Sequence, residues 1–126
     1  MNQSMFSNDF RTEIINWCQY HYGGNLVALA LFDPTHTDPP YPRSDINVLM
    51  VVNMAPDDAR ERYEMVTEMV MQNIARDKSL SCRVQTIGEL NMLAELGLPL
   101  LEIYLRDVEI IYDPKKILEG ERSNLK

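Results

Sequence analysis

The chain has 126 residues, of which 45% are hydrophobic and 25% charged, and its formal net charge is -7. This length, without a long Gly, Ser or charge run, predicts one globular domain over residues 1–126. The 12 basic residues are scattered, which excludes a general nucleic-acid binder, because phosphate contacts need clustered Lys and Arg. A nucleotide accompanied by magnesium is still compatible with this charge.

The N-terminus and the cysteines indicate the compartment. Residues 1–10 lack the basic start and apolar run of a signal peptide, and no apolar segment approaches the ~20 residues of a membrane span. Cys18 and Cys82 fall on different predicted elements without metal-ligand spacing, so we expect two reduced, packed thiols. The sequence therefore predicts a cytoplasmic protein that does not contact a membrane.

The first predicted elements are a helix and a strand. A helix over residues 8–22, capped by Ser7 or Asn8, is predicted because apolar side chains recur every three or four residues at Phe10, Ile14, Trp17, Cys18 and His21. Gly23-Gly24-Asn25 ends it. Leu26–Phe32 is an uninterrupted apolar run, which is typical of a central strand covered on both faces.

Prolines separate this strand from the next. Pro34, Pro39, Pro40 and Pro42 exclude helix and inner strand over residues 33–43, so this segment is predicted to be an exposed loop. Ile46–Val52 is the next buried strand.

A second helix is predicted over residues 57–76. Pro56 suits its first turn, and Asp57 and Asp58 favour the positive end of the helix dipole. The spacing predicts a core face, flanked by methionines, and a solvent face. The core face is Tyr63, Val66, Val70 and Ile74, the flanking residues are Met65 and Met69, and the solvent face is Arg60, Glu61 and Glu64.

The C-terminal half continues the alternation of strands and helices. We expect a strand at 80–86, short helices at 88–96 (closed by Gly97) and 99–105, a strand at 108–112 and a terminal helix from Asp113-Pro114. Interleaved strands and helices imply an α/β or α+β sandwich, a mixed β-sheet flanked by helices.

The strand at 46–52 opens with the residues that carry the candidate chemistry, Ser44-Asp45-Ile46-Asn47. Side chains two apart on a strand share a face, so Asp45 and Asn47 can reach the same ion or phosphate. A carboxylate and an amide oxygen are both oxygen ligands of the kind Mg²⁺ takes. This pattern predicts a site for metal-dependent nucleotidyl transfer, in which one acid has become an amide.

The chain resembles the minimal nucleotidyltransferases of the DNA polymerase beta superfamily, whose signature is Gly-Ser, ten residues, then Asp-x-Asp. Here Asp33-Pro34 is followed by ten residues and then by Asp45-Ile46-Asn47, and the tail Glu109–Pro114 is also similar. The resemblance implies a nucleotidyltransferase-like fold, Mg²⁺ and ATP as cofactors, and Asp45 as a catalytic residue. It also implies Asp45 and Asn47 as metal ligands, and a nucleotide site formed by Asp33, Pro34, Arg43, Ser44 and Asn47.

Three departures from the family pattern predict a degenerate site without transfer activity. Pro34 removes an amide donor, and the Asp33 carboxylate would repel a triphosphate. Asn47 offers an oxygen but no charge, which weakens magnesium binding. The third family acid normally lies in the strand after the long helix, but residues 81–85 contain no acid, and Arg83 there would oppose a cation.

Other functions stay open at this point. Asp33 could join Asp45 and restore a carboxylate pair, giving an active magnesium-dependent nucleotidyltransferase that moves a nucleoside monophosphate from NTP to a protein or RNA. Alternatively, the cleft could bind a nucleotide through Arg43 with Arg60 or Arg83, and Tyr41 could stack on its base. His21 is predicted to pack on the first helix and His36 to lie in the loop, and neither is assigned a catalytic role.

The resemblance also implies a partner. Minimal nucleotidyltransferases often pair with a helical nuclease-type toxin of the HEPN class and act as its antitoxin. The resemblance therefore implies that partner binding could be retained although nucleotidyl-transfer activity is lost. An acidic chain suits a basic partner. A homo-oligomer is also compatible with the sequence.

Overall fold

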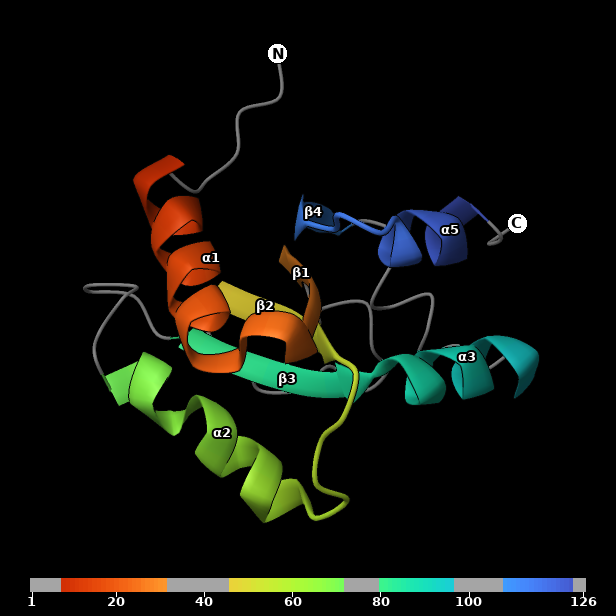
Figure 1. Cartoon of the computed structure of the whole chain (residues 1–126), viewed down its shortest axis with the longest axis horizontal. Coiled ribbons are helices and arrows are strands. Elements are labelled where there is room, and N and C mark those ends of the chain that lie inside the picture. The colour runs from red at the N-terminus through yellow and green to blue at the C-terminus, as the bar shows by residue number, and fades with distance from the viewer. Residues whose placement is uncertain (1–7, 32–45, 72–79, 97–107, 124–126) are drawn as a thin grey trace.

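The computed structural model describes residues 8–31, 46–71, 80–96 and 108–123 (Figure 1). Helix α1 (Asn8–Tyr22) and the 3-10 turn η1 (Gly23–Asn25) precede strands β1 (Leu26–Leu31) and β2 (Ile46–Val52). Next come α2 (Ala59–Met71), β3 (Leu80–Thr86) and α3 (Ile87–Leu96), and the chain ends with β4 (Glu109–Tyr112) and α5 (Ile117–Ser123). No helix in these ranges is long and apolar enough to cross a lipid bilayer.

The strands form a mixed sheet in the order β3-β2-β1-β4. β2 and β3 run parallel, whereas β1 is antiparallel to both β2 and β4. β1 lies inside the sheet and all six of its residues are buried, as its uninterrupted apolar run predicts. The predicted α/β class with a mixed sheet is confirmed.

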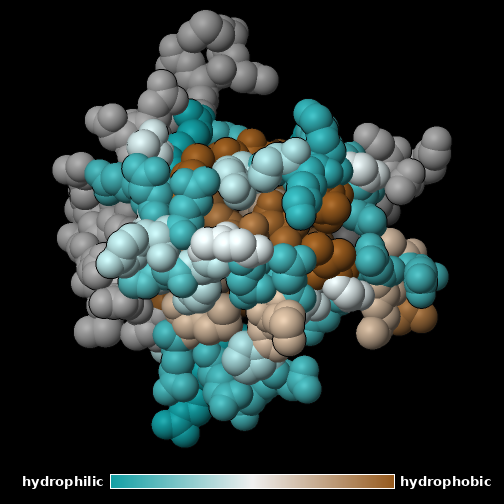
Figure 2. Space-filling view, in the orientation of Figure 1, coloured by the Kyte–Doolittle hydropathy of each residue, from teal (hydrophilic) through white to brown (hydrophobic). Residues whose placement is uncertain are grey.

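Among the described elements, α1 and α2 pack on one face of the sheet and α3 and α5 on the other, and side chains alternate between these faces along each strand. One face packs Val48, Met50 and Val52 against α1 and α2, which contribute Ile14, Trp17, Cys18 and Val66. The other face packs Leu49 and Val51 against Leu90 of α3 and Leu118 of α5. In the view of Figure 2, hydrophobic surface is visible over the strands, between α1 and α5. The alternation assigns Asn47 to the α3/α5 face.

Helix α1 follows its predicted bounds. Ile14, Trp17 and Cys18 are buried as expected, while the side chain of Phe10 lies outside the described part. His21 is exposed rather than buried, but its ring lies against that of Trp17, with 4.1 Å between the ring centroids. It therefore packs on the edge of the apolar stripe.

Helix α2 begins at Ala59, two residues later than predicted, because Asp58 is its N-cap. The Asp58 Oδ1 accepts hydrogen bonds from the backbone N–H groups of Arg60 (2.7 Å) and Glu61 (3.3 Å). An N-cap residue has a non-helical backbone, so the carboxylates at 57 and 58 precede the helix. The predicted end, residues 72–76, lies outside the described ranges.

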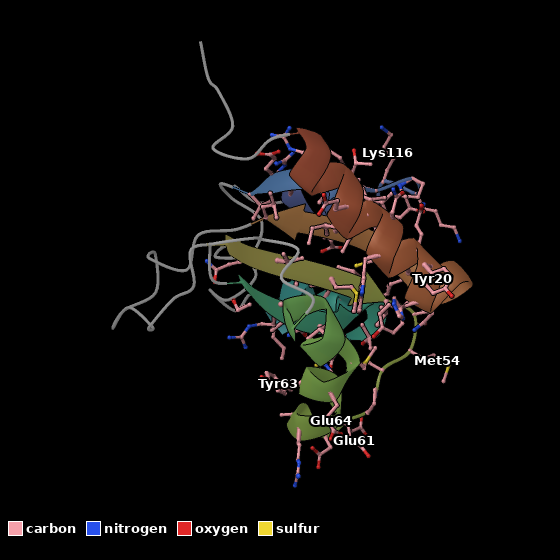
Figure 3. The ribbon with its side chains drawn as sticks, turned by 90° about the vertical axis from the view of Figure 1, so that its left-hand side faces the viewer. Tyr20, Met54, Glu61, Tyr63, Glu64 and Lys116 are labelled. Carbon is pink, nitrogen blue, oxygen red and sulfur yellow. The ribbon has the colours of Figure 1, made fainter. Side chains whose placement is uncertain are left out.

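The core face of α2 is turned by about one residue from the prediction. Tyr63 is 62% exposed, so its assignment to the core was wrong, whereas Val66 is buried as predicted. Arg62 and Met65 also turn inward, while the predicted core residues Val70 and Ile74 have side chains outside the described part. Figure 3 shows Tyr63, Glu61 and Glu64 projecting away from the sheet, and Glu61, Glu64 and Arg60 face solvent as expected. The rotation of α2 about its axis is set by Arg62, whose guanidinium is held by hydrogen bonds to α3 and β3.

The terminal helix begins at Ile117 and not at Asp113, which instead caps it. The Asp113 carboxylate accepts hydrogen bonds from the backbone N–H groups of Ile117 and Glu119, each at 2.9 Å. Lys116 completes the turn with a left-handed backbone (φ 59°). The predicted helix at 99–105 and the closing Gly97 lie outside the described residues.

Candidate functional site

The predicted site is only partly within the described residues. Asp33, Pro34, Arg43, Ser44 and Asp45 lie outside them, as do Tyr41 and His36. Asn47 is described, together with the strand β3, where the resemblance places the third family acid. The geometry of the site is therefore built from Asn47 and its neighbours on β3.

Asn47 is buried at the start of β2, with 8% of its surface exposed. The parallel register of β2 and β3 sets it beside Ser81. The Ser81 hydroxyl donates a hydrogen bond to the Asn47 Oδ1 over 2.9 Å. The amide oxygen that a metal ion would need thus already accepts a hydrogen bond from its neighbour on the adjacent strand.

Arg83 lies on the same face of the sheet as Asn47 and Ser81. In the parallel register it pairs with Leu49, which is two residues beyond Asn47 on β2. Both Ser81 and Arg83 are exposed on β3, which is an outer strand of the described sheet. Arg83 makes no hydrogen bond or ion pair with another residue in the described part of the chain.

These residues do not fit a magnesium ion held by carboxylates. The described groups are an engaged amide oxygen, a hydroxyl and a guanidinium, whereas Mg²⁺ is held in proteins mainly by carboxylates and phosphates. Within the described ranges, no three His, Cys, Asp or Glu side chains gather as a metal-binding set. The carboxylates that the sequence offers to this site, Asp33 and Asp45, lie outside those ranges.

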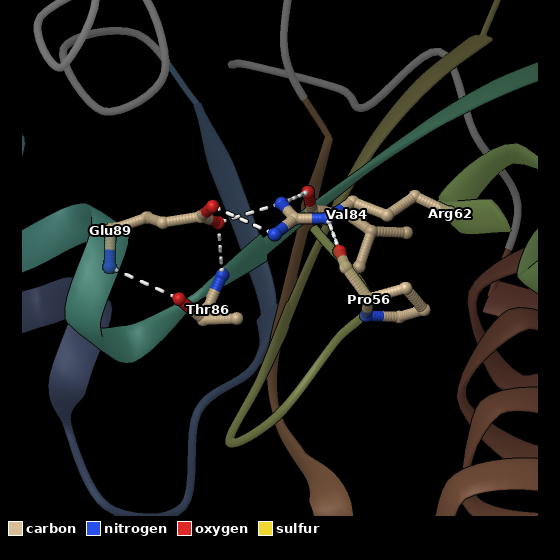
Figure 4. Close-up of polar contacts among 5 residues, drawn as sticks. All are labelled: Pro56, Arg62, Val84, Thr86 and Glu89. Carbon is tan, nitrogen blue, oxygen red and sulfur yellow. Dashed lines mark hydrogen bonds and ion pairs between the residues drawn. The ribbon is translucent and has the colours of Figure 1, made fainter. Parts of the chain in front are cut away.

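A second polar cluster lies at the other end of β3 and joins α2 to α3 (Figure 4). Arg62 donates two hydrogen bonds of 2.7 Å to Glu89, one to each carboxylate oxygen. Arg62 also donates to the backbone carbonyls of Val84 (3.1 Å) and Pro56. Glu89 further accepts the backbone N–H of Thr86 (2.9 Å), while the Thr86 hydroxyl accepts the N–H of Glu89 (3.1 Å). This reciprocal pair is a capping box at the start of α3.

The electrostatics of this cluster follow from the paired charges. The hydrogen bonds from Arg62 hold the pKa of Glu89 below its ordinary value, and the hydrogen bond to Glu89 raises the pKa of Arg62. The Thr86-x-x-Glu89 spacing is visible in the sequence as a capping signal. The partnership with Arg62, 27 residues away, is not, and sequence reasoning missed it.

The two cysteines are free thiols, as predicted, and the structure places both on the α1/α2 side of the sheet. Burial raises the pKa of Cys18 to about 12. Burial also raises the pKa of Cys82, with a smaller contribution from Cys18. Both thiols are therefore protonated at neutral pH and unsuited to nucleophilic chemistry or metal binding.

No protein-family model matches the chain, and no curated protein sequence matches it. Its fold is similar to that of a chain in the crystal structure of a toxin–antitoxin with AMP-PNP (TM-score 0.57, 14% identity, covering 90% of this chain and 81% of that chain). It is also similar to a chain in the crystal structure of the toxin–antitoxin MntA-HpeT, in a mutant with two aspartates, two positions apart, changed to glutamate. That match has a TM-score of 0.57 and 13% identity, and covers 90% of this chain and 80% of the other. The likeness concerns the fold, which is consistent with the nucleotidyltransferase-like fold that the sequence motif predicts.

Proposed function

We propose that this chain is an antitoxin-like module of nucleotidyltransferase fold that binds a partner protein in the cytoplasm and does not transfer nucleotides. The observation that carries this proposal is the hydrogen bond between Ser81 and Asn47. In the family pattern, Asn47 stands where the second metal-binding acid belongs, and β3 is the strand that normally supplies the third. At these positions on β2 and β3, this chain instead has the Asn47 amide and the Ser81 hydroxyl, which are hydrogen-bonded to each other.

The charge around this pair also opposes a metal-dependent reaction. Two-metal transfer needs carboxylates to hold the ions that carry the triphosphate and activate the acceptor. Arg83 is two residues from Ser81 along β3, ~7 Å away by strand geometry. At that distance a guanidinium repels a divalent cation by roughly 1–5 kcal/mol, for effective dielectric constants from about 80 down to 20. Of the family's acid positions, only that of Asp45 keeps a carboxylate, so a single negative charge at these positions offsets this repulsion.

Support for a protein partner comes from the structural neighbours and from the surface. Both neighbours are from toxin–antitoxin structures, and the mutated aspartates of one have the spacing of Asp45 and Asn47. Tyr20, Met54 and Tyr63 are 86%, 77% and 62% exposed, and such side chains are enriched at protein interfaces. Tyr63 projects from α2, and Glu61 and Glu64 project from another side of the same helix (Figure 3). The partner we propose is a toxin of the helical HEPN class.

The catalytic part of the proposal is tested with labelled ATP and magnesium. The purified chain is incubated with tRNA or with the candidate partner, and transfer of label to the acceptor is measured. We expect none above background. Transfer by the wild-type chain that disappears in Asp45→Ala would refute the proposal. The double variant Asn47→Asp, Ser81→Asp puts carboxylates on both strands and serves as a test of whether the fold can recover metal binding.

The partner part is tested with the adjacent reading frame. Its product, expressed alone, should arrest growth, and co-expression of this chain should relieve the arrest. Tyr63→Arg should weaken relief because it replaces an exposed aromatic ring of α2 with a charged side chain, whereas Lys116→Ala, on the turn before α5, should not. An adjacent product that neither arrests growth nor co-purifies with this chain would contradict the proposal.

A further inference from the structure

We infer that Arg83, together with Ser81, forms a metal-independent binding site for the phosphate groups of a nucleoside triphosphate. This inference rests on the proposed function, because it requires that magnesium no longer occupies this position. It assigns the degenerate site a ligand and a mode of recognition that differ from those of a metal-dependent transferase.

The strand geometry brings suitable groups to one place. Ser81 and Arg83 are two residues apart on β3, so both side chains leave the same face of the sheet. Asn47 lies beside Ser81 on β2 and joins it through the Oδ1 acceptor. Both β3 side chains are exposed, and a phosphate can approach them from solvent. The Ser81 hydroxyl can rotate from one acceptor, the Asn47 oxygen, to another, a phosphate oxygen.

The charge of Arg83 is not used within the described structure. Arg11, Arg62 and Arg122 form ion pairs with Glu109, Glu89 and Glu119 respectively. Arg83 has no such partner among the described residues, although the chain carries a net charge of -7. Arg60, the sequence-based alternative to Arg83 for binding a nucleotide, is also exposed, but it lies on the solvent face of α2, and α2 packs on the opposite face of the sheet from Ser81 and Arg83. Arg60 is therefore a matched control for a general effect of removing one positive charge.

The chemistry of a guanidinium suits a triphosphate. Its planar fork donates parallel hydrogen bonds to two phosphate oxygens, and it stays charged at every accessible pH. It can therefore balance part of the phosphate charge that magnesium balances in a metal-dependent site. Magnesium in solution then competes with Arg83 for the same oxygens. Added Mg²⁺ should accordingly weaken binding, which is the opposite of its effect on a working nucleotidyltransferase.

Isothermal titration calorimetry of the full chain with ATP in EDTA tests the site. We expect measurable binding that weakens when excess Mg²⁺ is added. Arg83→Ala should weaken it at least about tenfold, which corresponds to about 1.4 kcal/mol. The affinity of Arg83→Lys for ATP should lie between those of the wild type and Arg83→Ala, because lysine keeps the charge but lacks the planar guanidinium. Arg60→Ala should change the affinity by less than about twofold. Circular dichroism checks that each variant is folded.

A parallel titration with inorganic triphosphate separates the phosphate groups from the base. Equal affinity for inorganic triphosphate and ATP supports a site that reads phosphate alone, and tighter binding of ATP supports one that also contacts the nucleoside. No binding of ATP in EDTA, or binding that Arg83→Ala leaves unchanged, overturns the inference and leaves the proposed function standing. Binding that requires Mg²⁺ overturns the inference, and if label transfer accompanies it, the proposed function fails as well.

Discussion

Replacing Glu89 with alanine removes the central acceptor of the cluster that joins α2, β3 and α3. Two hydrogen bonds from Arg62 and one from the Thr86 backbone are lost together. Arg62 keeps its bonds to the carbonyls of Val84 and Pro56, so its guanidinium is not left without acceptors in a side chain that is 14% exposed.

The magnitude follows from the burial of each contact. A charged hydrogen-bonded pair contributes about 1.5–3 kcal/mol when well buried and about 0.2–1 kcal/mol when exposed. The Glu89 side chain is 36% exposed, so we take about 1–2 kcal/mol for its pair with Arg62. The lost cap adds about 1 kcal/mol. We expect Glu89→Ala to lower the free energy of unfolding by about 2–3 kcal/mol, and Tm by roughly 6–12 °C for a chain of this size.

Urea unfolding followed by the fluorescence of Trp17, the single tryptophan, measures this loss. Glu64→Ala is the control, because Glu64 is an exposed acid on α2 and should change stability by less than about 0.5 kcal/mol. A Glu89→Ala variant that is as stable as Glu64→Ala would show that the polar cluster around Arg62 and Glu89 does not stabilise the fold.

The same contact predicts a pH dependence. The pKa of Glu89 is lowered in the folded chain, chiefly by Arg62, from an ordinary value of 4.5. A lowered carboxyl pKa stabilises the fold above the unfolded pKa, and that stabilisation is lost as pH falls through the folded pKa. The difference in unfolding free energy between the wild type and Glu89→Gln should be largest near neutral pH and should shrink below about pH 4. A difference that stays constant or grows on acidification would refute this reasoning.

Three further predictions concern the core and the helix ends. Ile14→Ala removes a fully buried side chain and should cost about 2–5 kcal/mol in urea unfolding, and a loss under 1 kcal/mol would contradict the packing of α1 on the sheet. Asp113→Ala should cost about 1–2 kcal/mol, because two N–H groups of α5 lose their acceptor, while Asp113→Asn should retain part of this, as thermal melts can show. Cys18, with its pKa raised to about 12, should resist alkylation at pH 8 until urea unfolds the chain, and equal rates in both states would show that the thiol is accessible.

Several elements were predictable because their signals are local. The uninterrupted apolar run at 26–32 predicted an inner strand, and Leu26–Leu31, its described part, is buried throughout. Gly23-Gly24-Asn25 marked the end of α1, which stops at Tyr22. The capping carboxylates were harder to place, because Asp58 and Asp113 lie just before their helices and are as acceptable in the first turn as at the cap.

The phase of α2 could not be predicted from apolar spacing. Tyr63, Val66 and Val70 form a regular series that favours an inward Tyr63, yet this side chain is 62% exposed. Arg62 turns inward instead, because Glu89 and two backbone carbonyls accept its hydrogen bonds. A charged residue appears as a surface residue in the sequence unless its partner is known, and here the partner lies on another helix.

The sequence by itself determined the order of strands and helices, the apolar character of the core and the place of Asn47 in the motif, since these depend on neighbours within a few residues. Only the tertiary structure decided that Ser81 and Arg83 share a face with Asn47 and that the Ser81 hydroxyl bonds its amide oxygen. The parallel register of β2 and β3 sets both facts. That register depends on contacts between segments 34 residues apart, and no local pattern encodes them.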